Sequence, residues 1–513
     1  MSSWGGAARR TAVAALLAAA AAFVATSCSS APETTPPAPV SQSPVPSPGL
    51  AGFYGQQLEW RPCEGSFECA ELVVPRDYDR PDEGETEIAL LRVPGEKPLG
   101  PLVVNPGGPG GSGVEWAMFA DQILAADVSG AYQVVGFDPR GVGRSTGVDC
   151  VSDRQLDRWI AQDGDPRTRA EEEALLTAAQ RFAKRCGRTN GDWLAHIGTE
   201  SVVADLDILR SALDAQRLNY LGFSYGTTIG ALYADRFGPT TGRMVLDGAL
   251  PPQLTGDEVG LGQARGFEDA LRRYVEDCQR ADDCPVAGGD VDAGVARIQR
   301  FLADLQDAPL PTESGRDLNQ ALAAGSILYH LYFPSMGDWD SLSEGLRDAF
   351  SGDGTTLLDF YDTRLERQAG GRYRNNYQEA FFAVSCIDRG ERATADELRA
   401  RADAWAQEAP TFGRYLAWSE AACIGWPEEP EGGPRQVTGS EAGPILVVGT
   451  RHDPATPLQW AQLLVDRMAD AHLVIWESDG HTAFGNGSGC VDDAVGAYLL
   501  DGTLPAEDPL VCS

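Results

Sequence analysis

The amino-acid sequence predicts an α/β protein with a mostly parallel central sheet, helices on both faces of that sheet and one long helical insertion. Short continuous apolar runs are typical of strands that are buried on both faces, as parallel strands are. Helical patterns lie between several of these runs, which indicates strands and helices in alternation. One stretch, residues 256–442, is rich in helical patterns and poor in strands.

The predicted strands are runs of apolar and β-branched residues, and each of them ends in a glycine-rich or polar turn. The first ones follow the start of the folded body near Phe53, and the last two follow the helical insertion. They cover residues 71–75, 88–93, 101–105, 132–138, 218–223, 243–248, 444–450 and 472–478.

One helix between two predicted strands has a clear apolar face. In residues 201–213, valines and leucines recur at spacings of three and four, which is the spacing of one side of an α-helix. The insertion at 256–442 carries comparable patterns, such as "VARIQRFLADL", and predicts a helical cap between the sixth and seventh strands.

The N-terminal residues predict an export signal followed by a tether. Arg9 and Arg10 precede an apolar run, residues 12–25, that is too short to span a bilayer permanently. The run leads through "ATSC" to Cys28, which resembles a bacterial lipobox, so we expect residues 1–27 to be removed and Cys28 to carry lipid. Ordinary secretion is the alternative. Residues 28–50 are rich in proline and serine, as extended tethers are.

Charge and cysteine content restrict the partners and the compartment. The formal net charge of −34 argues against nucleic acid as a partner, because a polyanion is repelled. Without Cys28, ten of the 11 cysteines remain, and we expect an exported protein to oxidise them. Spacing does not determine the connectivity, but sequential pairing is our prediction: Cys63–Cys69, Cys150–Cys186, Cys278–Cys284, Cys386–Cys423 and Cys490–Cys512. No pair has zinc-ligand spacing beside a histidine, and we expect neither a metal nor a cofactor.

A serine between glycines follows the fifth predicted strand, in "LGFSYGTT" at residues 221–228. A turn this tight from strand to helix needs residues without a side chain on both sides of Ser224. The turn would present the hydroxyl of Ser224 at the end of the sheet. We therefore predict that Ser224 is a nucleophile.

Two further residues at strand ends complete a catalytic triad. Asp453 follows "ILVVGT", and His481 follows "HLVIWES". The order Ser, Asp, His is that of α/β-hydrolases and differs from the order in chymotrypsin and subtilisin. His481 would act as the general base, and Asp453 would orient its ring. Asp247, also at a strand end, is the alternative acid, and Thr456 is placed to hydrogen-bond Asp453.

The glycine-rich stretch "NPGGPGGSG" at residues 105–113 follows the third predicted strand and predicts an oxyanion loop. We assign one donor to the amide of Gly108, with Gly107 as the second choice, and the other donor to the amide of Tyr225. A phosphate-binding loop is the alternative, but no Walker or dinucleotide motif follows. In "GFDPRGVGRS", Asp138 and Arg140 are expected to hold loops beneath the site.

Together, "NPGGPGGSG", "FDPRGVGRS", "GFSYG" and "GTRHDPATP…DGHT" resemble the actinobacterial tripeptidyl aminopeptidases of the proline-iminopeptidase-like serine peptidase group. The likeness covers residues 58–513 approximately. It implies the α/β-hydrolase fold, formed by residues 53–255 and 443–513, with a helical cap over the site at 256–442. In the related proline iminopeptidases the oxyanion loop begins with histidine, where this sequence has Asn105.

An aminopeptidase also has to bind the free ammonium group of its substrate, and this demands a carboxylate. Asp388, in "FFAVSCIDRG" of the predicted cap, is the candidate. A solvated acid at the end of a helix is the equally weighted alternative.

These residues predict an exported, membrane-tethered serine exopeptidase that releases short peptides, tripeptides by resemblance, from free N-termini through an acyl-serine intermediate. Its partners would be peptide or protein N-termini and the membrane on the outer face of the cell. A carboxylesterase or lipase of the same fold is the first alternative, because it shares the triad. An inactive envelope binding protein is the second.

Overall fold

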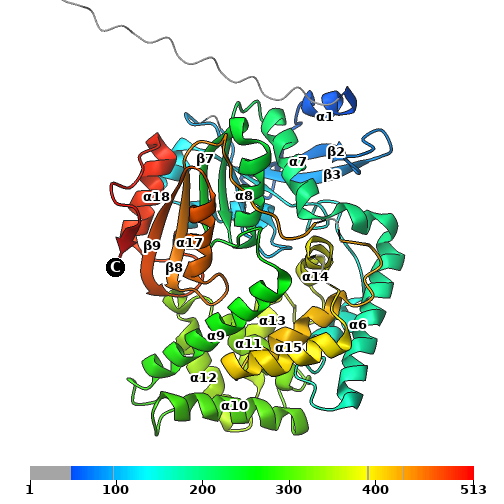
Figure 1. The fold of residues 1–513 in the computed structure, drawn as a ribbon, viewed down its shortest axis with the longest axis vertical. Helices are drawn as coiled ribbons and strands as arrows, with labels where there is room; N and C mark the ends of the chain where they lie inside the picture. The colour runs from blue at the N-terminus through cyan, green and yellow to red at the C-terminus, as the bar shows by residue number, and fades with distance from the viewer. Residues whose placement is uncertain (1–47, 96, 390–391, 431) are drawn as a thin grey trace, which may run out of the picture. The chain divides into compact units, whose positions relative to one another are not determined.

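The central sheet is mostly parallel, as predicted. A computed structural model of the chain describes residues 48–95, 97–389, 392–430 and 432–513 (Figure 1). The strands of these residues form one sheet in the order β1-β2-β3-β5-β4-β6-β7-β8-β9-β10. Strands β4 to β10 run parallel, and β1, β2 and β3 extend one edge with antiparallel pairings. Their bounds are β1 Arg61–Cys63, β2 Phe67–Pro75, β3 Glu85–Arg92, β4 Pro101–Asn105, β5 Gln133–Phe137, β6 Leu218–Phe223, β7 Thr241–Asp247, β8 Ile445–His452, β9 Ala471–Asp479 and β10 Leu510–Cys512.

All eight predicted strands are present, and the sequence missed β1 and β10. Each of the two missed strands has three residues and lies at an edge of the sheet. Neither is long enough to show a hydrophobic pattern of its own. The α/β class predicted from the sequence is therefore confirmed.

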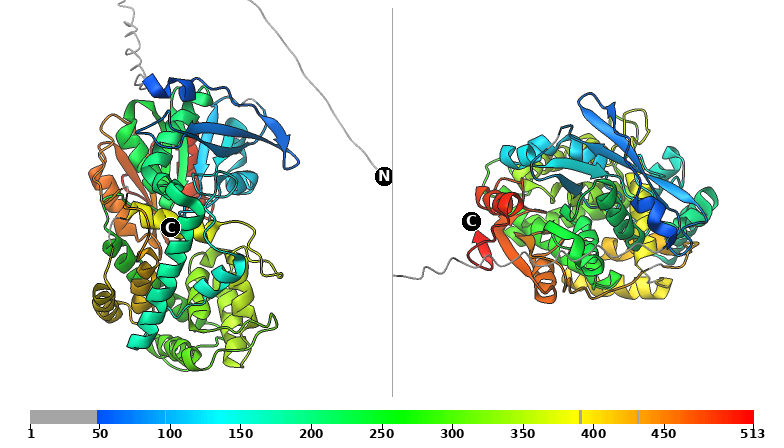
Figure 2. Two further views of the ribbon diagram at one scale, coloured as in Figure 1. Left: turned by 90° about the vertical axis from the view of Figure 1, so that its right-hand side faces the viewer. Right: turned by 90° about the horizontal axis from the view of Figure 1, so that it is seen from above.

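Helices cover both faces of the sheet (Figures 1 and 2). Alternate residues of a strand point to opposite faces, so Val103 of β4 packs in one hydrophobic cluster and its neighbours Leu102 and Val104 in another. The cluster of Val103 contains α7 (Thr199–Ala212), α8 (Tyr225–Arg236) and α17 (Leu458–Arg467). The opposite cluster contains α2 (Gly113–Met118), α4 (Ala126–Ala131) and α18 (Gly489–Asp501).

The chain between β7 and β8 forms a helical layer at the carboxyl ends of the parallel strands (Figure 1). Much of this layer shares a hydrophobic core of its own, around Leu271, Ile298 and Leu346. Its helices are α9 Gly256–Cys278, α10 Val291–Asp307, α11 Gln320–His330, α12 Asp338–Phe350, α13 Thr355–Arg364, α14 Tyr377–Asp388, α15 Ala395–Glu408 and α16 Gly413–Ser419.

An earlier part of the chain joins this helical layer. The long helix α6 (Arg169–Asn190) packs beside α15 and α16 (Figures 1 and 2). Arg399 of α15 forms an ion pair with Glu172 of α6 at 2.6 Å. The sequence did not predict this contribution, because α6 precedes the nucleophile and lies far from the insertion along the chain. The remaining helices are α1 Ala51–Tyr54, α3 Ala120–Ile123 and α5 Asp153–Ile160.

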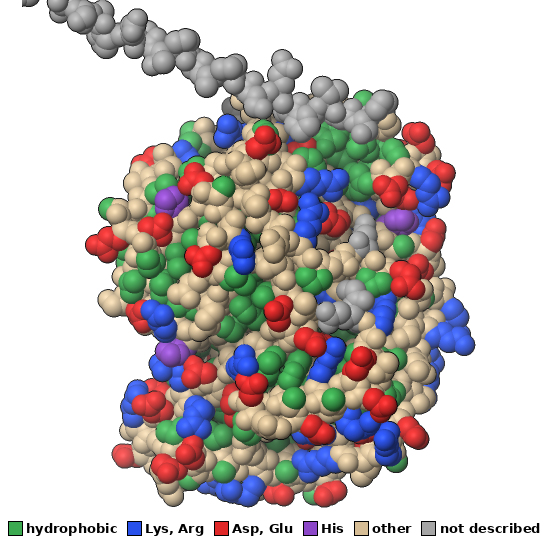
Figure 3. Space-filling model, in the orientation of Figure 1, with side chains coloured by type: hydrophobic (Ala, Val, Ile, Leu, Met, Phe, Trp, Pro, Cys, Tyr) green, Lys and Arg blue, Asp and Glu red, His purple; other side chains and the backbone are tan. Residues whose placement is uncertain are grey.

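All five predicted disulfides are present: Cys63–Cys69, Cys150–Cys186, Cys278–Cys284, Cys386–Cys423 and Cys490–Cys512. Among the described residues, no helix is long and apolar enough to cross a bilayer. The predicted signal segment and Cys28 lie outside the described residues. On the face shown in Figure 3, acidic and basic side chains are interspersed.

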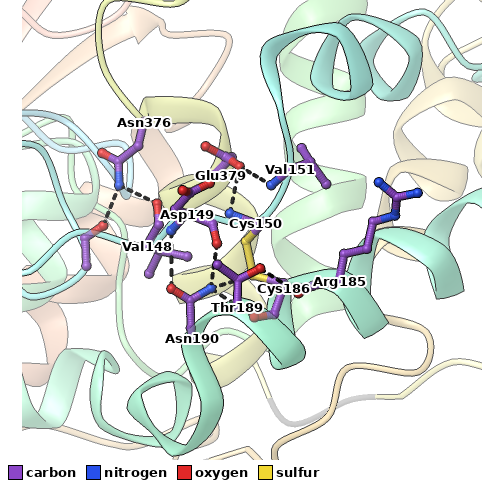
Figure 4. The surroundings of a disulfide bond; sticks show 11 residues. Val148, Asp149, Cys150, Val151, Arg185, Cys186, Thr189, Asn190, Asn376 and Glu379 are labelled. Carbon is purple, nitrogen blue, oxygen red and sulfur yellow. Dashed lines mark hydrogen bonds between the residues drawn. A yellow bond between two sulfur atoms is a disulfide. The ribbon is translucent and has the colours of Figure 1, made fainter.

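The Cys150–Cys186 disulfide lies where the cap is attached to the core (Figure 4). Glu379 of α14 is buried, and its carboxylate accepts the backbone N–H groups of Cys150 and Val151, both at 2.8 Å. Asn376, just before α14, donates to the carbonyl oxygens of Gly141 and Val148. The segment that leads into the disulfide is therefore a docking point for α14.

Asp138 and Arg140 hold the loops beneath the site, as expected. The Asp138 carboxylate accepts the Ser112 hydroxyl at 2.6 Å and the backbone N–H of Arg144 at 2.8 Å. Arg140 is fully buried and forms a bidentate ion pair with Asp205 of α7, with both contacts at 2.6 Å. Its guanidinium also donates to backbone carbonyl groups of residues 75, 76 and 196.

This buried ion pair generates a prediction about stability. Arg140→Leu leaves the Asp205 carboxylate buried without its cation, which typically costs about 3–5 kcal/mol. We expect the free energy of unfolding in urea to fall by that amount.

Arg61→Leu is the matched control, because its ion pair with Glu59 is exposed, with side-chain exposures of 78% and 79%. We expect this variant to unfold like the unmodified protein. A fall of similar size in both variants would show that burial is not the cause.

Candidate active site

The turn around Ser224 needs its glycines. Ser224 lies between β6 and α8, and its φ of 53° is in the left-handed region. A methyl group on Gly222 would lie 2.6 Å from the Gly226 carbonyl oxygen, and one on Gly226 would lie 2.8 Å from Asn105 Oδ1. Any side chain at either position would therefore displace the turn that carries Ser224.

Asp453 and His481 are in direct contact. His481 Nδ1 lies 3.0 Å from both carboxylate oxygens of Asp453. Both residues are buried, with exposed fractions of 6% for His481 and 3% for Asp453. A carboxylate at Nδ1 holds the proton on that nitrogen and leaves Nε2 free to accept one.

The Asp453 carboxylate is itself held by surrounding donors. It accepts the backbone N–H groups of Ala455 and Thr456 at 2.9 and 2.7 Å, and that of Thr482 at 3.2 Å. The Thr456 hydroxyl donates to it at 2.9 Å, which is the contact expected from the sequence. These bonds orient the carboxylate toward the imidazole.

Asp247, the alternative acid, makes its side-chain hydrogen bonds to the backbone and not to the imidazole. Its carboxylate accepts the backbone N–H groups of Ala483 and Phe484, which follow His481 in the chain. Burial raises the pKa of Asp247 to about 7. The acid beside the His481 ring is therefore Asp453.

Ser224 and His481 both lie against the end of β7. The backbone N–H of Ser224 donates to the Asp247 carbonyl at 2.8 Å. A methyl group on the next residue, Gly248, would lie 3.2 Å from His481 Cε1. Among the described residues, the Ser224 hydroxyl makes no hydrogen bond, so its contact with the His481 imidazole stays a prediction.

The oxyanion loop packs directly against the nucleophile turn. A methyl group on Gly107 would lie 2.9 Å from Ser224 Cβ and 2.5 Å from the Phe223 carbonyl oxygen. The Gly107 amide donates to Asn105 Oδ1 at 2.9 Å. Gly107, our second choice as a donor in the oxyanion hole, therefore has no free N–H group. Within the described residues, the amides of Gly108 and Tyr225 make no hydrogen bond and remain the candidate donors.

The cap contacts the histidine directly, and the sequence did not predict this. The backbone N–H of His481 donates to the carbonyl of Tyr332, which follows α11, at 2.7 Å. The Tyr332 ring meets the imidazole edge to face, with ring centres 5.3 Å apart. Nothing in the pattern "LYHLYFPS" distinguishes Tyr332 from its aromatic neighbours.

Asp388 lines a pocket that borders Tyr225, the residue after the candidate nucleophile. The pocket lies between core and cap and includes Pro109 of the oxyanion loop and Tyr225. Thr199 donates to the Asp388 carboxylate through its backbone N–H at 2.7 Å and its hydroxyl at 2.5 Å. Asp388 is therefore not a solvated helix end, and burial raises its pKa to about 6.

No group of three or more metal-ligating side chains occurs among the described residues. The candidate site consists of a serine, a histidine–aspartate pair and two free amides. This is the arrangement that nucleophilic acyl transfer requires.

Comparison with known proteins gives relatives over most of the chain. The chain is 36% identical to serine protease Hip1 of Mycobacterium tuberculosis, over 88% of this chain and 90% of that protein. It is 35% identical to carboxylesterase B of the same organism, over 92% and 90%. It is 30% identical to a tripeptidyl aminopeptidase of Streptomyces lividans, over 88% and 86%.

Two family models also match, "alpha/beta hydrolase fold" at residues 100–335 and "TAP-like protein" at residues 409–512. The first match includes the nucleophile turn and the oxyanion loop, and the second includes Asp453 and His481. The chain belongs to the TAP-like α/β-hydrolases, a family of serine hydrolases.

Proposed function

We propose that this serine hydrolase is an exopeptidase that removes tripeptides from free N-termini. Ser224 Oγ attacks the scissile carbonyl, and His481 Nε2 takes its proton. The Asp453 carboxylate stabilises the imidazolium that forms. The amides of Gly108 and Tyr225 donate to the oxyanion.

The same groups complete the acylation and then the hydrolysis of the acyl-serine. His481 returns the proton to the leaving amine, and the peptide remains as an ester on Ser224. Water, activated by His481, then hydrolyses this ester and releases the short peptide.

The observation that carries the tripeptide proposal is the connection from Ser224 to Asp388. The Tyr225 hydroxyl lies 2.5 Å from the Thr199 hydroxyl, which in turn donates to Asp388 at 2.5 Å. The side chain of Tyr225 and two hydrogen bonds connect the residue after Ser224 to Asp388, which limits their separation to about three extended residues at roughly 3.3–3.6 Å each. A substrate ammonium at Asp388 would therefore place its third residue at Ser224.

The charge state of Asp388 supports a cation as its ligand. Burial raises its pKa, and the two hydrogen bonds from Thr199, together with the neighbouring Arg389, only partly offset this effect. A carboxylate that accepts two hydrogen bonds still has lone pairs for a third donor. An incoming ammonium group would satisfy them and stabilise the ionised form.

The rest of the pocket supports an apolar first residue in the substrate. The residues that line the pocket include an apolar group, called the apolar wall here, made of Leu232, Leu250, Leu254 and Val259. The same wall is the reason to keep ester hydrolysis as the second candidate, since an acyl chain would also fit it. A relative named carboxylesterase B has 35% identity to the chain.

We further propose that the protein is exported and anchored at the outer face of the membrane through Cys28. The five disulfides support an oxidising compartment. They use ten cysteines and leave Cys28, the one that follows the apolar run.

A first prediction concerns the nucleophile. We expect a fluorophosphonate probe to label the protein at Ser224 and Ser224→Ala to lose labelling. We also expect kcat on a tripeptidyl anilide to fall about a million-fold in this variant. Absence of labelling in the unmodified protein would favour the inactive binding protein instead.

A second prediction concerns Asp388. We expect Asp388→Asn to raise KM for a free-amine tripeptidyl anilide about 10- to 100-fold, because a charge-assisted bond is lost. Fluorophosphonate labelling serves as the control, since it needs no ammonium, and should be unchanged. Equal activity on the N-acetylated anilide and the free amine would contradict the proposal and favour the esterase.

The pH dependence of binding gives a third prediction. As the pH falls through about 6, Asp388 takes up a proton and loses its attraction for the ammonium group. We therefore expect KM for the free-amine substrate to rise below pH 6 in the unmodified enzyme. In Asp388→Asn this rise should be absent, and its persistence there would assign the titration to another group.

A fourth prediction concerns the anchor. In cells fed an alkyne-tagged fatty acid, we expect the protein to become tagged and to sediment with membranes. Cys28→Ala should lose the tag and no longer sediment with membranes. A soluble, untagged unmodified protein would show ordinary secretion instead.

A further inference from the structure

The last residue of β7 contacts both halves of the candidate site. The Asp247 main-chain carbonyl accepts the backbone N–H of Ser224 at 2.8 Å. Its side-chain carboxylate accepts the N–H of Phe484 at 2.8 Å and that of Ala483 at 3.0 and 3.1 Å. Asp247 and Ala483 are both fully buried, so water does not compete for these bonds.

The next residue continues this connection. Gly248 has a φ of 69°, and its N–H donates to the Val448 carbonyl in β8. A methyl group on Gly248 would lie 3.0 Å from the Thr456 hydroxyl and 3.2 Å from His481 Cε1. The imidazole therefore rests against the backbone at the end of β7.

We propose that Asp247 is a positioning residue that holds the loop of His481 in register with the nucleophile turn. This inference rests on the proposed roles of Ser224 and His481. One rigid strand end binds the turn through its main chain and the histidine loop through its side chain. A shift of the loop by about 1 Å would move Nε2 away from the serine oxygen, and such shifts can cost 100-fold in rate.

The side chain has to be a carboxylate for this role. Two consecutive N–H groups point at it, and a carboxylate only accepts hydrogen bonds. An asparagine could place its oxygen where Oδ2 accepts both amides, but its NH₂ group would then take the place of Oδ1, which lies 3.1 Å from the Ala483 nitrogen. Two donors that face each other in a buried site repel, so the loop would move.

Another residue gives a matched control. Glu379 is also a buried carboxylate that accepts two consecutive backbone N–H groups, but these belong to Cys150 and Val151. Burial raises the pKa of both residues to about 7. Glu379→Gln therefore makes the same chemical change away from the histidine loop.

The experiment compares Asp247→Asn, Glu379→Gln and the unmodified protein. We measure the second-order rate of fluorophosphonate labelling, kcat and KM on a tripeptidyl anilide, and the melting temperature. We expect Asp247→Asn to lower the labelling rate and kcat about 10- to 100-fold, with KM changed less than about threefold. Glu379→Gln should keep its labelling rate within about twofold, even if its melting temperature falls equally and its KM rises, because labelling does not use the ammonium site at the end of α14.

Gly248→Ala is the second variant, and it remains informative if Asp247→Asn does not fold. Its methyl group presses on the His481 ring while the carboxylate stays in place, so we expect slower labelling with little change in KM. Wild-type labelling rates in folded Asp247→Asn, or equal losses in the two amide variants, would overturn the positioning role. If Ser224→Ala were still labelled, the proposed nucleophile itself would be wrong. That result differs from a failure of the positioning role, which would show only in Asp247→Asn.

Discussion

The buried Asp453 carboxylate is the interaction around which the candidate site is organised. It accepts hydrogen bonds from its own loop, from the Thr456 hydroxyl, from Thr482 and from the His481 ring. A charge with so little exposure is tolerable only because these donors surround it. The same donors prevent the imidazole from rotating, which links the stability of this region to its chemistry.

The candidate site spans neighbouring strands of one parallel sheet. The oxyanion loop follows β4, Ser224 follows β6, and Asp453 and His481 follow β8 and β9. Asp247 ends β7, between the strands of the nucleophile and the acid. In such sheets the carboxyl ends of the strands face one crevice, so groups far apart in the chain meet there.

The cap contacts the reacting groups as well as covering them. Tyr332 binds the backbone of His481, and Gln263 of α9 donates to the Ala455 carbonyl in the loop of Asp453. Helix α14 lies on the oxyanion loop and ends in Asp388. Substrate selection and the orientation of the triad therefore depend on the same packed interface.

Patterns in the sequence predicted the strands along the chain, the glycine-bounded serine, and the histidine and candidate acids at the ends of strands. These features are local, because apolar runs and tight turns are visible in adjacent residues, whereas the disulfide pairing was a prediction that only the folded chain could test. The role of Asp138 and Arg140 was also predictable, since both lie in a polar turn directly after a strand.

The groups that touch the triad became apparent only from the folded chain. The carboxylates of Asp247 and Asp453 both follow strands, and the sequence could not show which one faces the imidazole. Likewise, Gly107 and Gly108 are adjacent glycines, but only one amide is taken by Asn105. Tyr332, α6 and the partner of Asp388 come from distant segments, and their contacts arise from packing across the sheet and cap, which no local pattern records.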